Sequence, residues 1–246
     1  MELDLTFFLI AIPAVMFAGI SKGGFGSGAA FAAAPILSLI VEPAVAVGLM
    51  LPLLMLLDLV TLRPYWRQWS WPDARLLILG GVPGVALGAA FWTVASADVI
   101  RFLLGVISLA FVAHRISRTR GLARAFPPWV GALAGVVGGF TSFVSHAGGP
   151  PVAMYLLSRG LTKTEYQATT VLLFWAINVA KAVPYGVLGL FTVETLTAGA
   201  YLAPAAMFGA WLGVKAHRAI PESLFFGVTY VLLTLTGAKL IFDAVV

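Results

Sequence analysis

Two glycine-rich stretches interrupt long apolar segments, and they carry the side chains best suited to chemistry. Residues 19–28 combine five glycines with two serines and a lysine, and residues 138–151 combine four glycines with three hydroxyl side chains and one histidine. Glycine lets backbone N–H groups approach a ligand closely, and a helix that begins after such a break directs partial positive charge toward it. We therefore predict that the two stretches are facing tips of a site for an anionic ligand.

The candidate ligand contacts are the small and polar residues of both stretches, together with one polar face of a later helix. They are Ser21, Lys22, Gly23, Gly24, Gly26, Ser27, Gly28, Thr141, Ser142, Ser145, His146, Gly148, Gly149, Asn178, Lys181 and Tyr185. The alternative is that the glycines and serines only permit close helix packing, as small residues do in membranes.

Lys181 stands out because it lies deep in the apolar segment 165–189. Asn178 and Tyr185 lie three residues before it and four after it, so all three share a helix face. A cation at that depth normally faces a cavity or a partner. Lys181 can neutralise a bound anion or form a structural ion pair with Asp58. Lys22 can reach the same site or extend to the membrane surface.

His146 also has two readings. It is either a neutral imidazole that bonds the broken backbone, or a proton carrier or anion ligand, because histidine titrates near neutral pH. Asp58, His146 and Glu165 are the candidates for proton coupling. The chain has three histidines and no cysteine, and no histidine is paired with a carboxylate at i, i+4. We expect no metal site and no cofactor.

The composition places the chain in a membrane. Of its 246 residues 61% are hydrophobic and 10% are charged, and the mean hydropathy is +1.00. Soluble proteins carry about 25% charged residues. Prolines and charged residues separate the apolar stretches from one another. The stretches between them predict helices at 5–20, 25–41, 44–62, 75–95, 99–115, 129–143, 148–158, 165–189, 195–214 and 222–243. The segment 148–158 is too short to span.

Basic residues gather in four connections, and the acidic ones fall on the opposite side. Arg63 and Arg67, the arginines of 115–124, Arg159 with Lys163, and Lys215 with Arg218 predict cytoplasmic loops. Simple alternation then predicts that both termini are periplasmic. The N-terminus carries Glu2 and Asp4, where a cleaved signal peptide would have basic residues. We therefore expect the first helix to be retained.

The two halves of the sequence resemble each other. The string from Asp58 to Tyr65 matches the string from Asn178 to Tyr185 at an offset of 120 residues (178 − 58). The domains are then a first repeat at 1–116, a basic cytoplasmic loop at 117–128 and a second repeat at 129–246. Each repeat has about five helical segments, an odd number, so we predict two inverted-topology repeats in an all-α membrane protein. Broken or re-entrant helix pairs would meet near the midplane, and the first pair can also be read as two full spans.

The order of these motifs resembles the TauE/SafE sulfite exporter family. The resemblance rests on the glycine-rich break and the small-residue helix after it, on Ala46-Val47-Gly48, and on the run from Gly80 to Gly88. It implies a transporter of sulfite, thiosulfate or organosulfonates such as sulfoacetate in a bacterial inner membrane. The halves differ where His146 and Pro150-Pro151 stand against Gly26 and Ala30-Phe31.

We therefore expect a secondary transporter that works by alternating access, with proton coupling an open option, and not an enzyme. The alternatives are a small-anion channel and an intramembrane hydrolase that uses Ser27 and His146. The expected partners are a small anionic substrate, a sulfonate or sulfite, and membrane lipid, without nucleic acid. A homodimer is an open alternative to a monomer.

Overall fold

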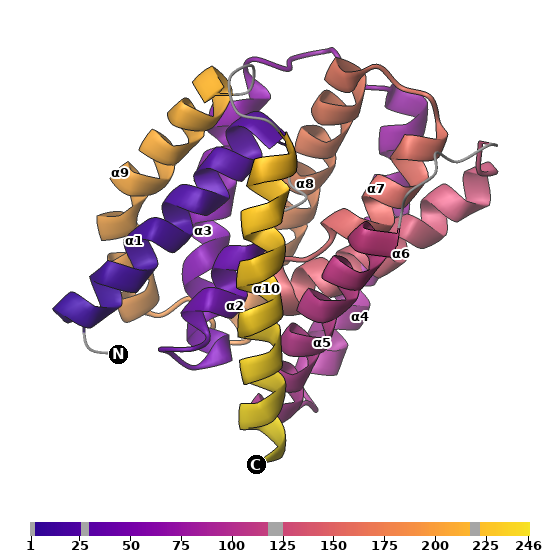
Figure 1. Cartoon of the computed structure of the whole chain (residues 1–246). Helices are drawn as coiled ribbons and strands as arrows, with labels where there is room; N and C mark the ends of the chain where they lie inside the picture. The colour runs from indigo at the N-terminus through magenta and orange to yellow at the C-terminus, as the bar shows by residue number, and fades with distance from the viewer. Residues whose placement is uncertain (1–2, 26–29, 118–124, 217–221) are drawn as a thin grey trace.

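The protein is a bundle of helices in which broken segments lie among long ones (Figure 1). The computed structural model describes residues 3–25, 30–117, 125–216 and 222–246. Those residues form α1 (Leu5–Ile20), α2 (Ala33–Leu37), α3 (Pro43–Leu62), α4 (Trp71–Trp92), α5 (Ala97–Ser117), α6 (Pro128–Ser145), α7 (Gly149–Ser158), α8 (Lys163–Val187), α9 (Val193–Ala216) and α10 (Glu222–Val245). A π-helical turn (Ser21–Phe25) extends α1, and a 3-10 turn (Ala30–Ala32) precedes α2.

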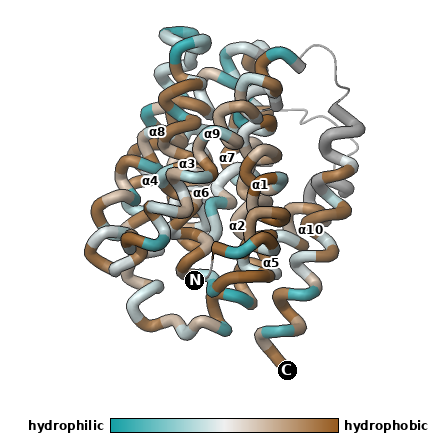
Figure 2. The backbone as a smooth tube through the Cα atoms, turned by 90° about the vertical axis from the view of Figure 1, so that its left-hand side faces the viewer, coloured by the Kyte–Doolittle hydropathy of each residue, from teal (hydrophilic) through white to brown (hydrophobic). Residues whose placement is uncertain are grey.

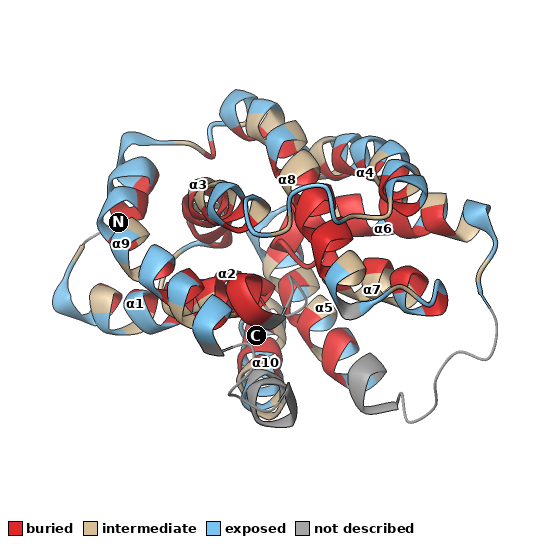
Figure 3. Ribbon diagram, turned by 90° about the horizontal axis from the view of Figure 1, so that it is seen from above, coloured by how far each residue is buried: buried red, intermediate tan, exposed pale blue. Residues whose placement is uncertain are grey.

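The chain is a multi-pass membrane protein. Within the described residues, six helical segments are long and apolar enough to cross a membrane: Leu5–Gly24, Pro43–Leu62, Trp71–Trp92, Pro128–Ser145, Thr164–Val187 and Val193–Lys215. Figure 2 shows apolar residues along these helices. Viewed from above, the exposed residues lie toward the periphery and the buried ones toward the centre (Figure 3). Large apolar side chains such as Leu79, Tyr201 and Leu235 are exposed on the outside, where lipid would cover them.

Local sequence signals account for most helix boundaries. Pro43 and Pro128 occupy first helical positions, where the missing N–H costs nothing. Thr162 and Glu165 form a capping box that begins α8. The short helix predicted at 148–158 is confirmed as α7, of ten residues.

The helix predicted over 25–41 is the exception. The described part of this segment consists of the 3-10 turn and α2, which has only five residues. The following residues, from Ser38, make turns instead of a further helix. A helix of this length rises about 7–8 Å, far less than the apolar thickness of a bilayer. The second member of the first pair therefore does not span, and the reading of two full spans is wrong.

Contacts between helices recur when each helix is replaced by the helix in the same position of the other half. If α1 to α5 are matched in order with α6 to α10, the contact of α4 with α6 corresponds to that of α9 with α1. The contact of α3 with α9 likewise corresponds to that of α8 with α4, and both contacts are observed. The pairs α5–α10 and α3–α8 correspond to themselves and also pack together. This is the pattern that a repeat requires, whereas the inversion of the second half stays a prediction.

Candidate functional site

A buried ion pair joins the first glycine-rich stretch to α3. Nζ of Lys22, in the π-helical turn after α1, contacts Oδ1 of Asp58, and it also donates to the carbonyl of Leu54 over 3.3 Å. The second carboxylate oxygen of Asp58 accepts from Nδ2 of Asn178 over 2.6 Å. Asp58 thus connects a broken segment of the first half to the long helix α8 of the second. Lys22 points inward and does not extend to the surface.

Lys181 lies on the same face of α8, one turn from Asn178, and its side chain is completely buried. Nζ donates to the carbonyl of Ser142 at 3.0 Å and to its hydroxyl at 3.1 Å, and lies 2.8 Å from Nδ1 of His146. None of these partners is a carboxylate. The alternative reading of Lys181, a structural ion pair with Asp58, is therefore wrong, because Lys22 and Asn178 occupy the carboxylate. The charges of Lys22 and Asp58 are nonetheless close enough to act on Lys181.

His146 ends α6 in an unusual backbone conformation. Its φ is +58°, in the left-handed region, and its N–H donates to the carbonyl of Ser142 over 2.9 Å, which terminates the helix. Its Nε2 lies 3.0 Å from the carbonyl of Val47 on α3. A carbonyl only accepts, so Nε2 carries hydrogen, and Nδ1 faces Lys181. The imidazole therefore ties the second tip to a helix of the first half.

Other hydroxyls of the second stretch serve the broken backbone. Thr141 donates to the carbonyl of Ala147 over 3.1 Å, and Ser145 donates to the carbonyl of Thr141 over 2.9 Å. Tyr185 donates to the carbonyl of Phe143 over 2.6 Å. The bonds to Ala147 and Phe143 satisfy carbonyls at the helix break, as an apolar environment requires, whereas the bond of Ser145 to Thr141 is an i−4 bond within α6. Thr141, Ser145 and Tyr185 thus position the tip, and they do not point a free donor into the cluster.

Glycines in and beside both tips permit close approach of neighbouring backbone segments. A Cβ on Gly23 would lie 2.3 Å from the carbonyl oxygen of Ala210, and one on Gly24 would lie 2.3 Å from that of Gly213, both on α9. A Cβ on Gly148 would lie 2.6 Å from the carbonyl oxygen of Gly138. Packing, the alternative reading, accounts for these three glycines. Ser21 and Gly149 are buried at the end of α1 and the start of α7.

Of the remaining predicted site residues, three lie outside the described residues and one caps a helix. Gly26, Ser27 and Gly28 lie outside the described residues. Glu165 is half-buried, and its carboxylate accepts from the backbone and hydroxyl of Thr162 at the start of α8. Its role in the structure is helix capping.

Sequence reasoning missed two contributors to the cluster. The carbonyl of Val47 binds His146, and Nε2 of Gln167 donates to the carbonyl of Lys22 over 3.3 Å. A backbone carbonyl has no side-chain signature, so Val47 could not have been found. Gln167 carried a usable signal, because it is a polar residue eleven positions before Asn178, three helical turns along the same face of α8.

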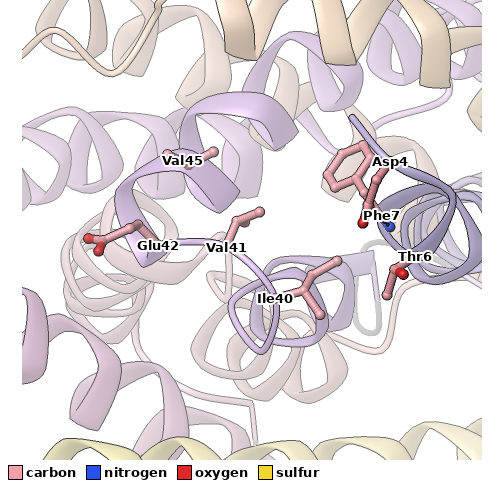
Figure 4. A pocket seen from close by; sticks show the side chains of 7 residues that line it. All are labelled: Asp4, Thr6, Phe7, Ile40, Val41, Glu42 and Val45. Atoms are coloured by element: carbon pink, nitrogen blue, oxygen red, sulfur yellow. Dashed lines mark hydrogen bonds between the residues drawn. The ribbon is translucent and has the colours of Figure 1, made fainter. Parts of the chain in front are cut away.

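A surface hollow lies elsewhere. Its volume is about 490 Å³, and it opens between the start of α1 and the connection from α2 to α3 (Figure 4). The lining residues are Asp4, Thr6, Phe7, Ile40, Val41, Glu42 and Val45. Asp4 already caps α1 by accepting from the N–H of Phe7. The hollow contains none of the cluster residues and two carboxylates, so we assign the site to the buried cluster and not to this hollow.

The described cluster consists of Lys22, Asp58, Ser142, His146, Asn178 and Lys181, at 5, 1, 1, 6, 3 and 0% exposure. Ionisable groups buried at a helix break inside a membrane bundle define a class: a multi-pass protein with a polar site among broken helices. Both ring nitrogens of His146 are engaged by Val47 and Lys181, which gives no support to a serine–histidine hydrolase.

The sulfite exporter TauE/SafE family model matches residues 11–240, and the chain belongs to that family. The family is one of membrane exporters of sulfite. Comparison with curated proteins gives no match, and neither does comparison with solved structures.

Proposed function

We propose that the chain is a secondary transporter of sulfur-containing oxyanions or organosulfonates, and that the substrate binds at Lys181. One observation carries this proposal: Lys181 is a fully buried basic group that has no carboxylate among its hydrogen-bond partners. A buried charge without a counter-charge is costly inside a membrane protein. A bound anion would supply the missing charge. Its oxygens could accept from the ammonium group of Lys181 and from the hydroxyl of Ser142.

Alternating access follows from the way the cluster is enclosed. The break after α1 supplies Lys22 and the break after α6 supplies His146, so each half contributes one tip. All six cluster side chains are buried, so a substrate could enter only after a tip moves. Movement of one tip at a time would open the site to one side of the membrane. Asp58 or His146 would carry the proton if transport is coupled.

We place the basic connections in the cytoplasm of a bacterial cell and both termini in the periplasm. The connections from α3 to α4 and from α7 to α8 lie at the upper side in Figure 1, and both termini lie at the lower side. Arg63, Arg67 and Arg159 lie at these upper connections. An inside-negative potential of 100 mV favours export of one negative charge by about 2.3 kcal/mol. The same potential opposes uptake unless a cation accompanies the anion.

The test is ligand-induced stabilisation of the detergent-purified chain by sulfite, thiosulfate, sulfoacetate, taurine, toluenesulfonate and matched carboxylates. A ligand at 100 times its Kd stabilises the folded state by about 2.7 kcal/mol. We expect a selective shift with at least one sulfur anion, and none in Lys181→Ala. A shift with carboxylates or cations alone would reject the proposal.

Transport itself is measured in proteoliposomes. Counterflow of labelled substrate against unlabelled substrate supports a carrier, and rapid single-channel current would support the anion channel instead.

A further inference from the structure

Asp73, in the first turn of α4, binds the end of the short helix α7, and its side chain is buried. Oδ1 accepts from the hydroxyl of Tyr155 over 2.9 Å and from Nε of Arg159 over 2.8 Å. Oδ2 accepts from the hydroxyl of Ser70 over 2.6 Å. Tyr155 lies in the last turn of α7, and Arg159 directly follows that helix. One carboxylate of the first half therefore fixes the end of a helix of the second half.

The helix α7 connects this carboxylate to the second tip, the segment 146–148 between α6 and α7. It starts at Gly149 and has ten residues, so it is about 15 Å long. Its end is also packed against α6, because a Cβ on Gly131 would lie 2.6 Å from Cζ of Tyr155. A helix of about three turns without an internal break moves as one piece. The bonds to Asp73 therefore restrain the second tip as well as the end of the helix.

The bond between Asp73 and Arg159 can open without leaving the guanidinium group buried. The side chain of Arg159 is 31% exposed, so water can take the place of the carboxylate when the two separate. Release of Arg159 also uncovers Asp73, which keeps the hydroxyl of Ser70 as a partner. Lys22 and Asp58 differ in this respect, because their side chains are only 6 and 1% exposed. The ion pair at Asp73 is thus suited to form and break, and the one at Asp58 to persist.

The short helix of the first half offers no such bond. The five residues of α2 are two alanines, a proline, an isoleucine and a leucine, without a polar side chain. Ser38, after the helix, donates to the carbonyl of Ala34 within its own segment, over 2.9 Å. The connection 38–42 lines two hollows, one of about 490 Å³ beside the start of α1 and one of about 620 Å³ beside the end of α10. The end of α2 therefore has space on two sides and no polar side chain of its own to fix it.

We propose that Asp73 is a positioning residue of the transport cycle. It holds the second tip closed through Tyr155 and Arg159, and it releases them before the site opens past that tip. The inference rests on the proposed function, because it assumes that the two tips open in turn. Arg159 lies at the connections that we place in the cytoplasm, so this bond closes the cytoplasmic side. The first tip, whose helix α2 has no such bond, opens more readily and toward the opposite side.

Access to one introduced cysteine tests the inference without any substrate, because the chain has no cysteine of its own. The reporter is Ala147→Cys, at a position in the second tip that is 1% exposed. A membrane-impermeant maleimide is applied to either face of sealed vesicles of known orientation. We expect Asp73→Ala to speed labelling from the cytoplasmic face by about tenfold or more, and to leave labelling from the other face unchanged.

The matched control is Asp98→Ala. Asp98 also lies in the first turn of its helix, α5, and it pairs with Arg101 at 2.7 Å, but this ion pair stays within one helix. Its removal should not change the labelling of the reporter. If Asp73→Ala does not fold, Arg159→Met carries the same test, because it removes the partly exposed partner and leaves the buried carboxylate bound to Tyr155 and Ser70.

A reversible bridge distinguishes a bond that opens during transport from one that only supports the fold. Asp73→Cys combined with Arg159→Cys is joined by a reducible bifunctional thiol reagent, and counterflow of radiolabelled sulfite is measured in proteoliposomes. We expect the bridged protein to exchange sulfite about tenfold more slowly than the unbridged one, and reduction to restore the rate. A bond that stays closed throughout transport predicts equal rates before and after bridging.

The outcomes separate the inference from the proposed function. Unchanged labelling in both Asp73→Ala and Arg159→Met, labelling that rises equally from both faces, or a bridged protein that exchanges as fast as the unbridged one overturns the inference and leaves the proposed function standing. If neither sulfite nor any other sulfur anion binds or exchanges, the proposed function fails. The labelling rates then still decide whether Asp73 holds the second tip closed.

Discussion

The side-chain amide of Asn178 donates to the carboxylate of Asp58 over 2.6 Å, and the two residues are 120 positions apart. The same offset aligns Pro64 and Tyr65 with Pro184 and Tyr185 in the sequence. In the predicted repeat these two residues are counterparts of each other. The prediction then makes the central contact of the cluster a contact between one position of the first half, an acid, and the same position of the second half, an amide.

The ion pair between Lys22 and Asp58 predicts a strong coupling in stability. Asp58→Asn leaves a buried lysine without its counter-charge and should lower the free energy of unfolding by about 3–5 kcal/mol. Lys22→Met combined with Asp58→Asn should regain most of this loss, because no charge is left unpaired. Denaturant unfolding of the two single variants and the double variant measures the coupling. Additive losses would show that the pair is not a unit in the folded protein.

Replacement of Lys181 by Met separates a binding role from a structural one. Lys181 is buried with no carboxylate among its hydrogen-bond partners, so an apolar side chain of similar length removes a basic group that is costly to bury. We expect Lys181→Met to unfold at the same temperature as wild type or higher, and to lose anion-induced stabilisation. A variant that is strongly destabilised yet still binds anions would assign Lys181 to structure.

The backbone conformation of His146 predicts that a glycine at this position is more stable than an alanine. Its φ of +58° costs a residue with a side chain about 1–2 kcal/mol relative to glycine. His146→Gly and His146→Ala both lose the imidazole bonds, but only glycine relieves the backbone. His146→Gly should therefore be more stable than His146→Ala by about 1 kcal/mol. Equal stabilities, or the reverse order, would mean that the tip does not hold this conformation.

Most of the fold could be predicted because apolar length, proline and charge determine where membrane helices begin and end. The predicted segments 165–189 and 195–214 correspond to α8 and α9 within two residues at each end. The segment 25–41 could not be placed, because glycine and alanine are compatible with a helix, a turn or a break. Whether such a segment stays helical depends on its neighbours, which a single sequence does not specify.

The site was predictable as a region but not as a set of contacts. Lys181, Asn178 and Asp58 stood out because polar groups are costly in apolar segments. Which lysine faces Asp58 depends on how far the first tip carries Lys22 toward α3 and α8, so the sequence could not decide between Lys22 and Lys181. Hydroxyls that serve the backbone, such as that of Ser145, carry the same sequence signal as those that face a ligand.

The glycine contacts predict that Gly→Ala substitutions destabilise the protein equally where α6 crosses α4 and where α1 crosses α9. A Cβ on Gly139 of α6 would lie 2.1 Å from the carbonyl oxygen of Gly81 on α4, and one on Gly19 of α1 would lie 2.3 Å from that of Ala206 on α9. Both crossings join backbone to backbone, so Gly139→Ala and Gly19→Ala should each lower the free energy of unfolding by about 1–3 kcal/mol. Gly227→Ala on α10 is the matched control. Nothing lies within 4 Å of its added methyl group, so helix propensity should stabilise it by up to about 1 kcal/mol. If only one crossing is sensitive, the two halves do not pack equivalently, and the repeat loses its support in the contacts.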